Sequence, residues 1–381
     1  MPSTRSAGRL HPVATRVRLI RFIRPTVPEP EAWLPHLRSS YEQRVFANTG
    51  PAAVRLEAAL TRRYATSDRE AVLVANCTSG LTAALLAVGA TGRVIVPAFS
   101  FPATAQAVLQ AGCEPMFCDV SPDTWELDPQ RLSEALAGGQ ASTVLHVRAF
   151  GFCRDLAGLA EIAARHQARF LVDGAAALGG RLPEGAWVGG QGEAEVFSMH
   201  VTKVFGIGEG GVVFTSRQHA TRLRQACNFG IAGTDVASRG MNAKLSDFHA
   251  AIGLAVLDRI DDYIARRLEV AGRFNEALAD CSWVTLPVGI GTPPMQTYPV
   301  LVDSERRARL LVEGSLRRGV ELRRYYSPAL HRTAAFASYA RAALPVSEDL
   351  SSRMVCLPVY SDMTDAEAQT IIDTVTEVAC A

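Results

Sequence analysis

Seven short runs of apolar residues divide the first half of the chain. They are rich in Val, Phe and Leu and nearly continuous, a pattern typical of strands covered on both faces of a sheet. The runs are AVLVANC (71–77), RVIVPAF (93–99), EPMFCDV (114–120), STVLHVRAF (142–150), RFLVDGA (169–175), AEVFSMH (194–200) and GGVVFTS (210–216). The pattern therefore predicts a sheet of seven strands.

Helical patterns separate the first five runs, among them SGLTAALLAVGA, PATAQAVLQAG and RDLAGLAEIAARHQ. Strands that alternate with helices form parallel or mostly parallel sheets. The last two runs are joined by a short link (201–209) without helical periodicity, which predicts an antiparallel turn there.

A second, smaller α/β domain is predicted after the sheet. A long amphipathic pattern (245–278) indicates a helix that leads away, and strand-like segments, a helix around 304–318 and a final helix (365–378) follow. We expect a large α/β domain over residues 25–255, a small C-terminal α/β domain over 256–381, and a poorly ordered tail over 1–24.

Composition excludes several classes of protein. Of the 381 residues, 48% are hydrophobic and 20% charged, which is typical of a soluble globular chain. The net charge of +1 gives no support for a nucleic-acid or anionic-membrane partner. No apolar run reaches the ~18 residues that span a bilayer. The Arg-rich N-terminus lacks the apolar core of a secretory signal, and a transit peptide is the alternative to a simple tail.

Eight cysteines are scattered along the chain, and no two have the CxxC spacing of a zinc or redox site. Cysteines in apolar surroundings usually behave as small buried hydrophobes. We expect reduced thiols, no metal site and a cytoplasmic location.

Candidate chemistry lies at the carboxyl ends of the predicted strands, where open α/β sheets bind ligands. Thr78 and Ser79 follow the first strand and open a helix, whose free amides and dipole attract anions. An ordinary helix cap is the alternative explanation for these hydroxyls. Asp173 ends the fifth strand, where an unpaired carboxylate is costly. It is part of a structural ion pair, a cap, or the partner of a protonated cofactor nitrogen.

Lys203 lies in the Gly-rich segment FSMHVTKVFGIGEGGVVF (197–214). A lysine shielded from water has a lowered pKa and can form a Schiff base; the alternative is an exposed loop lysine. Together with Asp173 and the helix start at Thr78, it describes a site for pyridoxal 5′-phosphate. The phosphate would bind the helix start, the aldehyde Lys203 and the pyridine nitrogen Asp173.

From about residue 25 to the C-terminus the sequence resembles the DegT/DnrJ/EryC1/StrS sugar aminotransferases, which have the fold type I of pyridoxal-phosphate enzymes. The resemblance rests on RVIVPAFSFPATAQAVLQAGCEPMFCDVSPDTWELDP, on FSMHVTKVFGIGEGGVVFT, on SRGMNAKLSDFHAAIGLAVL, and on YYSPALH with MVCLPVYSDMT. It implies a large domain with a seven-stranded, mostly parallel sheet flanked by helices, and a smaller C-terminal α/β domain.

The resemblance also implies roles for single residues. Lys203 would carry the cofactor as an internal aldimine and move the proton, and Asp173 would keep the pyridine nitrogen protonated. Thr78, Ser79 and Ser198 would hold the phosphate, and Phe101 would stack on the ring. Asn242 would reach the phosphate of the other subunit, which implies a homodimer with its active site at the interface. Tyr325, in the C-terminal signature, is a candidate substrate residue.

Four positions depart from the family pattern. Ala176 stands where Gln or His usually bonds the cofactor's 3′-oxygen, and Cys77 stands where Gly or Ala precedes the phosphate-site Thr. Arg148 replaces a His and is a candidate contact for a substrate phosphate or carboxylate. Lys244 replaces an Arg two residues after Asn242.

The resemblance implies a transaminase that moves an amino group from L-glutamate or glutamine to a nucleotide-linked keto-deoxysugar by a ping-pong Schiff-base mechanism. Three alternatives remain open. A keto-cyclitol could be the acceptor, the chain could be a related sugar dehydratase, or it could be a non-catalytic binding or regulatory protein with the same fold. Lys203 argues against the dehydratase, which typically has His there, and Ala176 favours the binding protein.

Overall fold

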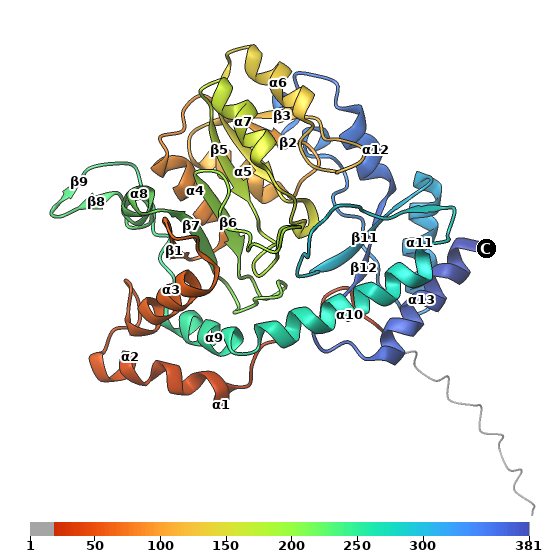
Figure 1. Ribbon diagram of the computed structural model, residues 1–381, viewed down its shortest axis with the longest axis horizontal. Coiled ribbons are helices and arrows are strands. Elements are labelled where there is room, and N and C mark those ends of the chain that lie inside the picture. Colours follow the sequence, from red (N-terminus) through yellow and green to blue (C-terminus); the bar gives the residue numbers. More distant parts are fainter. Residues whose placement is uncertain (1–18, 381) are drawn as a thin grey trace, which may run out of the picture.

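A seven-stranded sheet forms the centre of the molecule, whose computed structural model describes residues 19–380 (Figure 1). The strands are β1 (Arg69–Val74), β2 (Arg93–Pro97), β3 (Glu114–Cys118), β4 (Ala141–Val147), β5 (Arg169–Asp173), β6 (Ala194–Ser198) and β7 (Gly211–Ser216). Their order is β1-β7-β6-β5-β4-β2-β3. Only β7 runs antiparallel to its neighbours, β1 and β6. The predicted sheet, strand positions and antiparallel turn are confirmed.

Helices cover both faces of this sheet because its strands carry apolar side chains on both. Val72, Val74 and Val96 pack toward α4, α5 and α8, whereas the alternate residues Leu73 and Ile95 pack toward α3, α9, α6 and α7. The helices are α3 (Pro51–Tyr64), α4 (Cys77–Ala87), α5 (Pro102–Gln110), α6 (Pro129–Ala137), α7 (Ala157–Arg165), α8 (Arg217–Cys227) and α9 (Asp247–Leu257). The short helices α1 (Pro30–Trp33) and α2 (Arg38–Gln43) precede them. This part of the chain has three layers.

A smaller three-stranded antiparallel sheet has the order β10-β11-β12. Its strands are β10 (Val284–Thr285), β11 (Thr297–Val302) and β12 (Met354–Pro358), and its helices are α10 (Ile260–Leu278), α11 (Glu305–Arg317), α12 (Pro345–Arg353) and α13 (Asp365–Cys380). Phe274, Tyr298 and Ile371 belong to its separate hydrophobic core. No helix within residues 19–380 has both the length and the apolar character needed to cross a bilayer.

The structure corrects the predicted boundary at residue 25. Ile20 is buried, its amide donates to the Gly319 carbonyl at 2.8 Å, and it forms a parallel bridge with Val320. Arg24 is bonded to Glu367 at 2.7 Å. Residues 19–24 therefore pack with the small sheet and are not a poorly ordered tail, because their apolar and charged side chains have partners there. Residues 1–18 lie outside the described part.

The single helix expected over 245–278 is two helices, with a break at Asp258 and Arg259. In Figure 1 α9 and α10 follow one another along the lower edge of the molecule. The break separates two environments: α9 is buried in the core under the large sheet, and α10 packs on the small sheet. Asp261 and Asp262 fall in the first turn of α10, where acidic side chains interact favourably with the helix dipole.

The small sheet's part of the chain is held against the carboxyl ends of the large sheet. Asp119, just after β3, accepts hydrogen bonds from the backbone amides of Val346 and Ser347 at the start of α12, at 3.1 and 2.8 Å. The Leu330 amide donates to the Ala98 carbonyl just after β2 at 2.9 Å. These contacts place residues of both parts around one cavity.

Candidate active site

A cavity of about 760 Å³ lies at the carboxyl ends of the central strands, where β11 and β12 approach them. Eight of the nine residues proposed from the sequence line it: Thr78, Ser79, Phe101, Arg148, Asp173, Ser198, Lys203 and Tyr325. Asn242 does not. The topology thus gathers segments that are far apart in sequence, as expected for the strand ends of an open sheet.

Lys203 follows β6 in a short turn, and its amine lies inside the cavity. Nζ donates a hydrogen bond to Oε1 of Gln296 at 2.9 Å. Burial lowers the pKa of Lys203, and nearby Cys77 and Asp173 only partly oppose this effect. Lys203 is half-buried, and its lowered pKa supports the prediction of a lysine partly shielded from water.

Asp173 ends β5 and is buried, with 4% of its surface exposed. Its Oδ2 accepts a hydrogen bond from Thr104 Oγ1 at 2.7 Å, and its Oδ1 accepts one from the Ala175 amide at 3.1 Å. Burial raises the pKa of this carboxyl, and these two hydrogen bonds and Lys203 oppose the rise. No ion pair to it is present within residues 19–380, so the structural ion pair considered from sequence is absent there.

The start of α4 and the end of β6 form the proposed phosphate end. Asn76 is the helix cap, because its Oδ1 accepts from the Ser79 amide at 2.9 Å. The Ser79 hydroxyl donates to the Asn76 carbonyl at 2.9 Å, whereas the Thr78 hydroxyl has no hydrogen bond to any residue in the described range. Ser198 Oγ accepts from the His200 amide at 3.2 Å and keeps its own proton to donate. Thr78 and Ser198 therefore offer free donors, and Ser79 is committed to the cap.

An aromatic ring and two small side chains complete this end of the cavity. Phe101 lines the cavity and is 54% exposed, so much of its ring surface is not covered by other residues. Ala176 also lines the cavity and brings no hydrogen-bonding group there. Burial raises the pKa of Cys77 well above its usual value, so it is a neutral thiol.

The structure gives Arg148 a different role from the predicted substrate contact. Its Nε is paired with Glu195 at 2.6 Å, and Nη2 donates to Gln191 Oε1 at 2.6 Å. Nη1 donates to the carbonyls of Phe152 and Arg154. Only 2% of Arg148 is exposed, so its guanidinium is held in the protein interior. The carboxylate of Glu195 takes the place that a substrate anion would have.

Tyr325 lines the cavity as expected, and its hydroxyl accepts a hydrogen bond from Arg323 Nη1 at 3.1 Å. Its ring packs edge-on against Phe22, which also lines the cavity. The N-terminal segment 19–24 thus contributes to the wall next to Tyr325.

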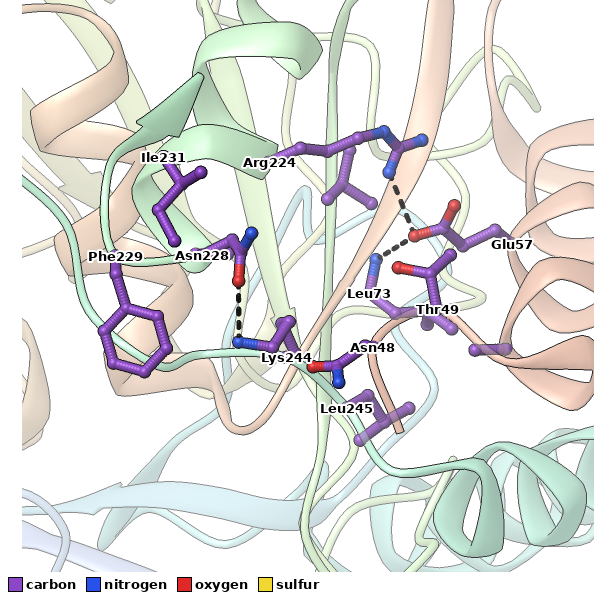
Figure 2. A pocket seen from close by; sticks show the side chains of 13 residues that line it. Asn48, Thr49, Glu57, Leu73, Arg224, Asn228, Phe229, Ile231, Lys244 and Leu245 are labelled. Carbon is purple, nitrogen blue, oxygen red and sulfur yellow. Dashed lines mark hydrogen bonds and ion pairs between the residues drawn. The ribbon is translucent and has the colours of Figure 1, made fainter. Parts of the chain in front are cut away.

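Asn242 lies beside a second cavity, of about 520 Å³, which shares no lining residue with the first. Figure 2 shows Lys244 here, with Nζ 3.0 Å from Asn228 Oδ1. The same Nζ donates to Asn242 Oδ1 at 2.7 Å and lies 4.7 Å from the centre of the Phe229 ring. Across this cavity Arg224 pairs with Glu57. The side chain of Asn242 is therefore not directed at the cofactor cavity of its own chain.

Several cavity residues were missed in the sequence. Thr104 lies in the first turn of α5, and Asn76 directly precedes the helix start at Cys77. Both positions follow a predicted strand, so the sequence indicated that they lie near the site. Gln296 comes from the small part of the chain, and its sequence neighbourhood carries no comparable signal. The sequence around Arg267 is that of an ordinary amphipathic helix, which gives no indication that this arginine is buried.

These side chains fit pyridoxal phosphate. A buried amine, a buried carboxylate without a cationic partner, an exposed aromatic ring and free donors at a helix start match its aldehyde, ring nitrogen, ring and phosphate. The volume is within the ~300–1,000 Å³ of small-molecule sites. Within residues 19–380 no three His, Cys, Asp or Glu side chains are grouped to hold a metal.

Fold and site together define a pyridoxal-phosphate-dependent aminotransferase of fold type I. The chain belongs to the DegT/DnrJ/EryC1/StrS aminotransferase family, whose sequence profile matches residues 31–376.

Similar proteins include transaminases that act on sugars. The chain is 28% identical to a dTDP-4-amino-4,6-dideoxy-D-glucose transaminase of Shigella dysenteriae, over 93% of this chain and 97% of the relative. It is 31% identical to Protein Rv3402c of Mycobacterium tuberculosis, over 97% and 92%. Among solved structures, DesI in the presence of its TDP-sugar product has a TM-score of 0.88 at 31% identity, covering 97% of this chain and 94% of that one.

Proposed function

We propose that the protein transfers an amino group from L-glutamate or L-glutamine to a nucleotide-linked keto-deoxysugar. The observation that carries this proposal is the buried Lys203 amine in one cavity with the buried, unpaired Asp173 carboxylate. Two half-reactions would share this cavity, first with the amino donor and then with the keto sugar, which gives ping-pong kinetics.

The cofactor would be held by residues of four strand ends. Lys203 Nζ would attach its aldehyde, Asp173 would accept a hydrogen bond from its ring nitrogen, and Thr78 and Ser198 would donate to its phosphate. Phe101 would cover the ring. When bound, pyridoxal phosphate supplies an electron sink for the negative charge that develops on the reacting carbon.

Lys203 Nζ would also move the proton. An amine with a lowered pKa is neutral over more of the working pH range, so it can take a proton from the substrate carbon and return it. Gln296 Oε1, 2.9 Å from Nζ in this structure, would hold the released amine near the reacting carbon. The negative charge of Asp173 would keep the ring nitrogen protonated, and that contact would offset the cost of burying the carboxylate.

A nucleotide-linked sugar is the acceptor that the comparisons favour. The dTDP-sugar named for the Shigella transaminase and the TDP-sugar product named for DesI are both nucleotide-linked. A keto-cyclitol is the alternative acceptor, so the test includes keto-cyclitols.

We further propose a cytoplasmic homodimer. Asn242 lies apart from the cofactor cavity of its own chain, so in a homodimer it would reach the phosphate bound by the second subunit. Beside it the hairpin of β8 (Ile231–Ala232) and β9 (Asp235–Val236) projects from the molecule (Figure 1). Phe229 and Val236 are exposed there, a feature of protein–protein contact surfaces. All eight cysteines lack a disulfide partner, which supports a reducing compartment.

The test is a pair of absorbance measurements on the holoenzyme. L-Glutamate or L-glutamine should bleach its visible band within one turnover. The resulting amino form should regain the band with nucleotide-linked keto sugars from a panel that also contains keto-cyclitols. Recovery with cyclitols alone would contradict the sugar assignment, and a band that no amino donor bleaches would contradict transamination.

A further inference from the structure

Arg267 is a buried cation that the proposed mechanism does not use. It lies on α10, is 3% exposed, and lines the same cavity as Lys203 and Asp173. Its Nε donates to Ser361 Oγ at 2.8 Å, and its Nη1 donates to the Val359 carbonyl at 2.8 Å. These partners are neutral, so they hold the side chain in place without balancing its charge.

No acidic side chain within residues 19–380 forms an ion pair with Arg267. The Asp362 carboxylate raises the pKa of Arg267 through space, but it is paired with Arg24 at 3.1 Å. Burial lowers the pKa of Arg267 to about 10, so the group is still charged at neutral pH. Nη2 has no hydrogen-bond partner in the described part of the chain. A buried charge without a counterion is costly, and an anion in the cavity would offset that cost.

Arg267 is also connected to the Lys203 amine through one residue, Gln296. Its Nη1 donates to the carbonyls of Met295 and Gln296, at 3.1 and 3.3 Å. The side chain of the same Gln296 accepts from Lys203 Nζ at 2.9 Å. One residue thus links the unpaired guanidinium to the amine at which substrates react.

The chemistry of the amino donor fits this arrangement. In an α-amino acid the carboxylate is bonded to the carbon that carries the amino group, so it must lie close to Lys203 Nζ during reaction. The proposed phosphate-binding donors, Thr78 and Ser198, come from the start of α4 and the end of β6, whereas Arg267 is on α10 and contacts the backbone at Gln296 and Val359. A guanidinium with free N–H groups is well suited to bind a carboxylate.

We propose that Arg267 binds the α-carboxylate of the amino donor. This inference rests on the proposed function, since it names the residue that recognises the donor at the same site. The amino donor and its keto-acid product carry this carboxylate, whereas the keto sugar does not. Arg267 would therefore serve only the half-reaction with the amino donor.

The first test compares Arg267→Lys with Arg266→Lys, a matched control on the same helix. Arg266 also donates to a backbone carbonyl, that of Met363, but it pairs with Glu269 and Asp365 at the surface. Bleaching of the holoenzyme is measured with L-glutamate and with 4-aminobutanoate, which lacks the α-carboxylate. We expect Arg267→Lys to lower the apparent affinity for L-glutamate ~10- to 100-fold, the loss of a charge-assisted hydrogen bond. The rate of Arg267→Lys with 4-aminobutanoate should stay within about threefold of the wild-type rate. Arg266→Lys should change neither the affinity for L-glutamate nor the rate with 4-aminobutanoate.

A binding measurement tests the same inference without turnover. Calorimetric titration of the holoenzyme with glutarate, an unreactive dicarboxylate, should show the same loss of affinity in Arg267→Lys. Equal losses with L-glutamate and 4-aminobutanoate, or no loss with L-glutamate and glutarate, would overturn the proposal and leave Arg267 as a structural clamp on the loops around Met295 and Val359. Failure of the wild type to respond to any amino acid would instead contradict the proposed function, while glutarate would still test Arg267.

If Arg267→Lys does not fold, the proposal can be tested on the wild-type protein. A crystal structure of the holoenzyme with glutarate should place a carboxylate within hydrogen-bond distance of Arg267 Nη2. A carboxylate bound elsewhere in the cavity, for example on Arg24, would overturn the proposal.

Discussion

Lys203 and Asp173 are ionisable groups of opposite type in one low-dielectric cavity. Burial lowers the pKa of Lys203 and raises that of Asp173, so each is driven toward its neutral form. Shifted pKa values at two groups in one cavity are typical of active sites. For the lysine the shift favours a nucleophilic amine, and for the aspartate it creates a need for a cationic partner.

The shifted lysine makes a prediction about stability and pH in the cofactor-free protein. The folded-state pKa of Lys203 lies below its ordinary value of 10.5, so the unfolded chain binds more protons between these two values. The free energy of unfolding of the wild type should therefore rise with pH across this window. Lys203→Met removes the titrating amine. The variant's free energy of unfolding should therefore exceed that of wild type most near pH 7, and the difference should shrink toward pH 10.

Urea unfolding of both proteins at several pH values measures this difference. A difference that stays constant or grows between pH 7 and pH 10 would contradict a buried lysine with a lowered pKa.

Asp173→Asn tests the role of the carboxylate in the rate. The amide cannot keep a bound ring nitrogen protonated, so the half-reaction with L-glutamate should slow by ~100-fold or more. Thr104→Val is the control, because it removes one hydrogen bond to Asp173 at 2.7 Å but leaves the charge. It should slow the reaction less than about tenfold. Stopped-flow absorbance gives both rates, and an Asp173→Asn rate within about twofold of wild type would make Asp173 a structural residue.

At the scale of elements, the start of α4 and the end of β6 together form the proposed phosphate site. Two hydroxyls there differ in a way that the structure makes testable: Ser198 keeps a free donor, whereas Ser79 donates to the Asn76 carbonyl. We expect Ser198→Ala to weaken pyridoxal phosphate binding ~10- to 100-fold. Ser79→Ala should weaken it only a few-fold. Fluorescence titration of the cofactor-free protein measures both constants, and a larger loss for Ser79→Ala would reverse the assignment.

The strands were predictable because each is a short apolar run buried on both faces. The helices between them indicated that most of the strands run parallel. The break between α9 and α10 was not predictable, since no Pro or Gly lies at Asp258 and Arg259. The segment 19–24 was misjudged because its partners, at 319–321 and 362–367, are distant in sequence. Long-range contacts of this kind leave no local pattern.

The site was predictable where chemistry coincided with a strand end, as at Asp173 and Lys203. Arg266 and Arg267 are adjacent and identical in type, yet Arg266 forms surface ion pairs and Arg267 is buried in the wall of the cavity that also contains Lys203. Only the packing of α10 against the small sheet distinguishes them. The sequence could not show that Arg148 is paired with Glu195 instead of a substrate anion, because Glu195 is on a different strand, β6.

At the scale of the whole molecule, the proposed homodimer would build each active site from residues of two chains. Asn242→Ala and Lys203→Ala should each inactivate a homodimer. If Asn242 acts on the partner's cofactor, a dimer with one chain of each kind has one intact site. Equal mixtures refolded together should therefore regain about one quarter of wild-type activity, since half of the dimers are mixed and each has one site of two. Mixtures that stay inactive would place Asn242 and Lys203 in the same chain's site.

The central claim is that Lys203 holds the cofactor, and sodium borohydride tests it directly by fixing the cofactor to the amine that carries it. After reduction and proteolysis of the holoenzyme, mass spectrometry should find the modification on the peptide that contains Lys203. Lys203→Ala should lack both the modification and the visible band. Modification of another lysine, or an unchanged band in Lys203→Ala, would contradict the account.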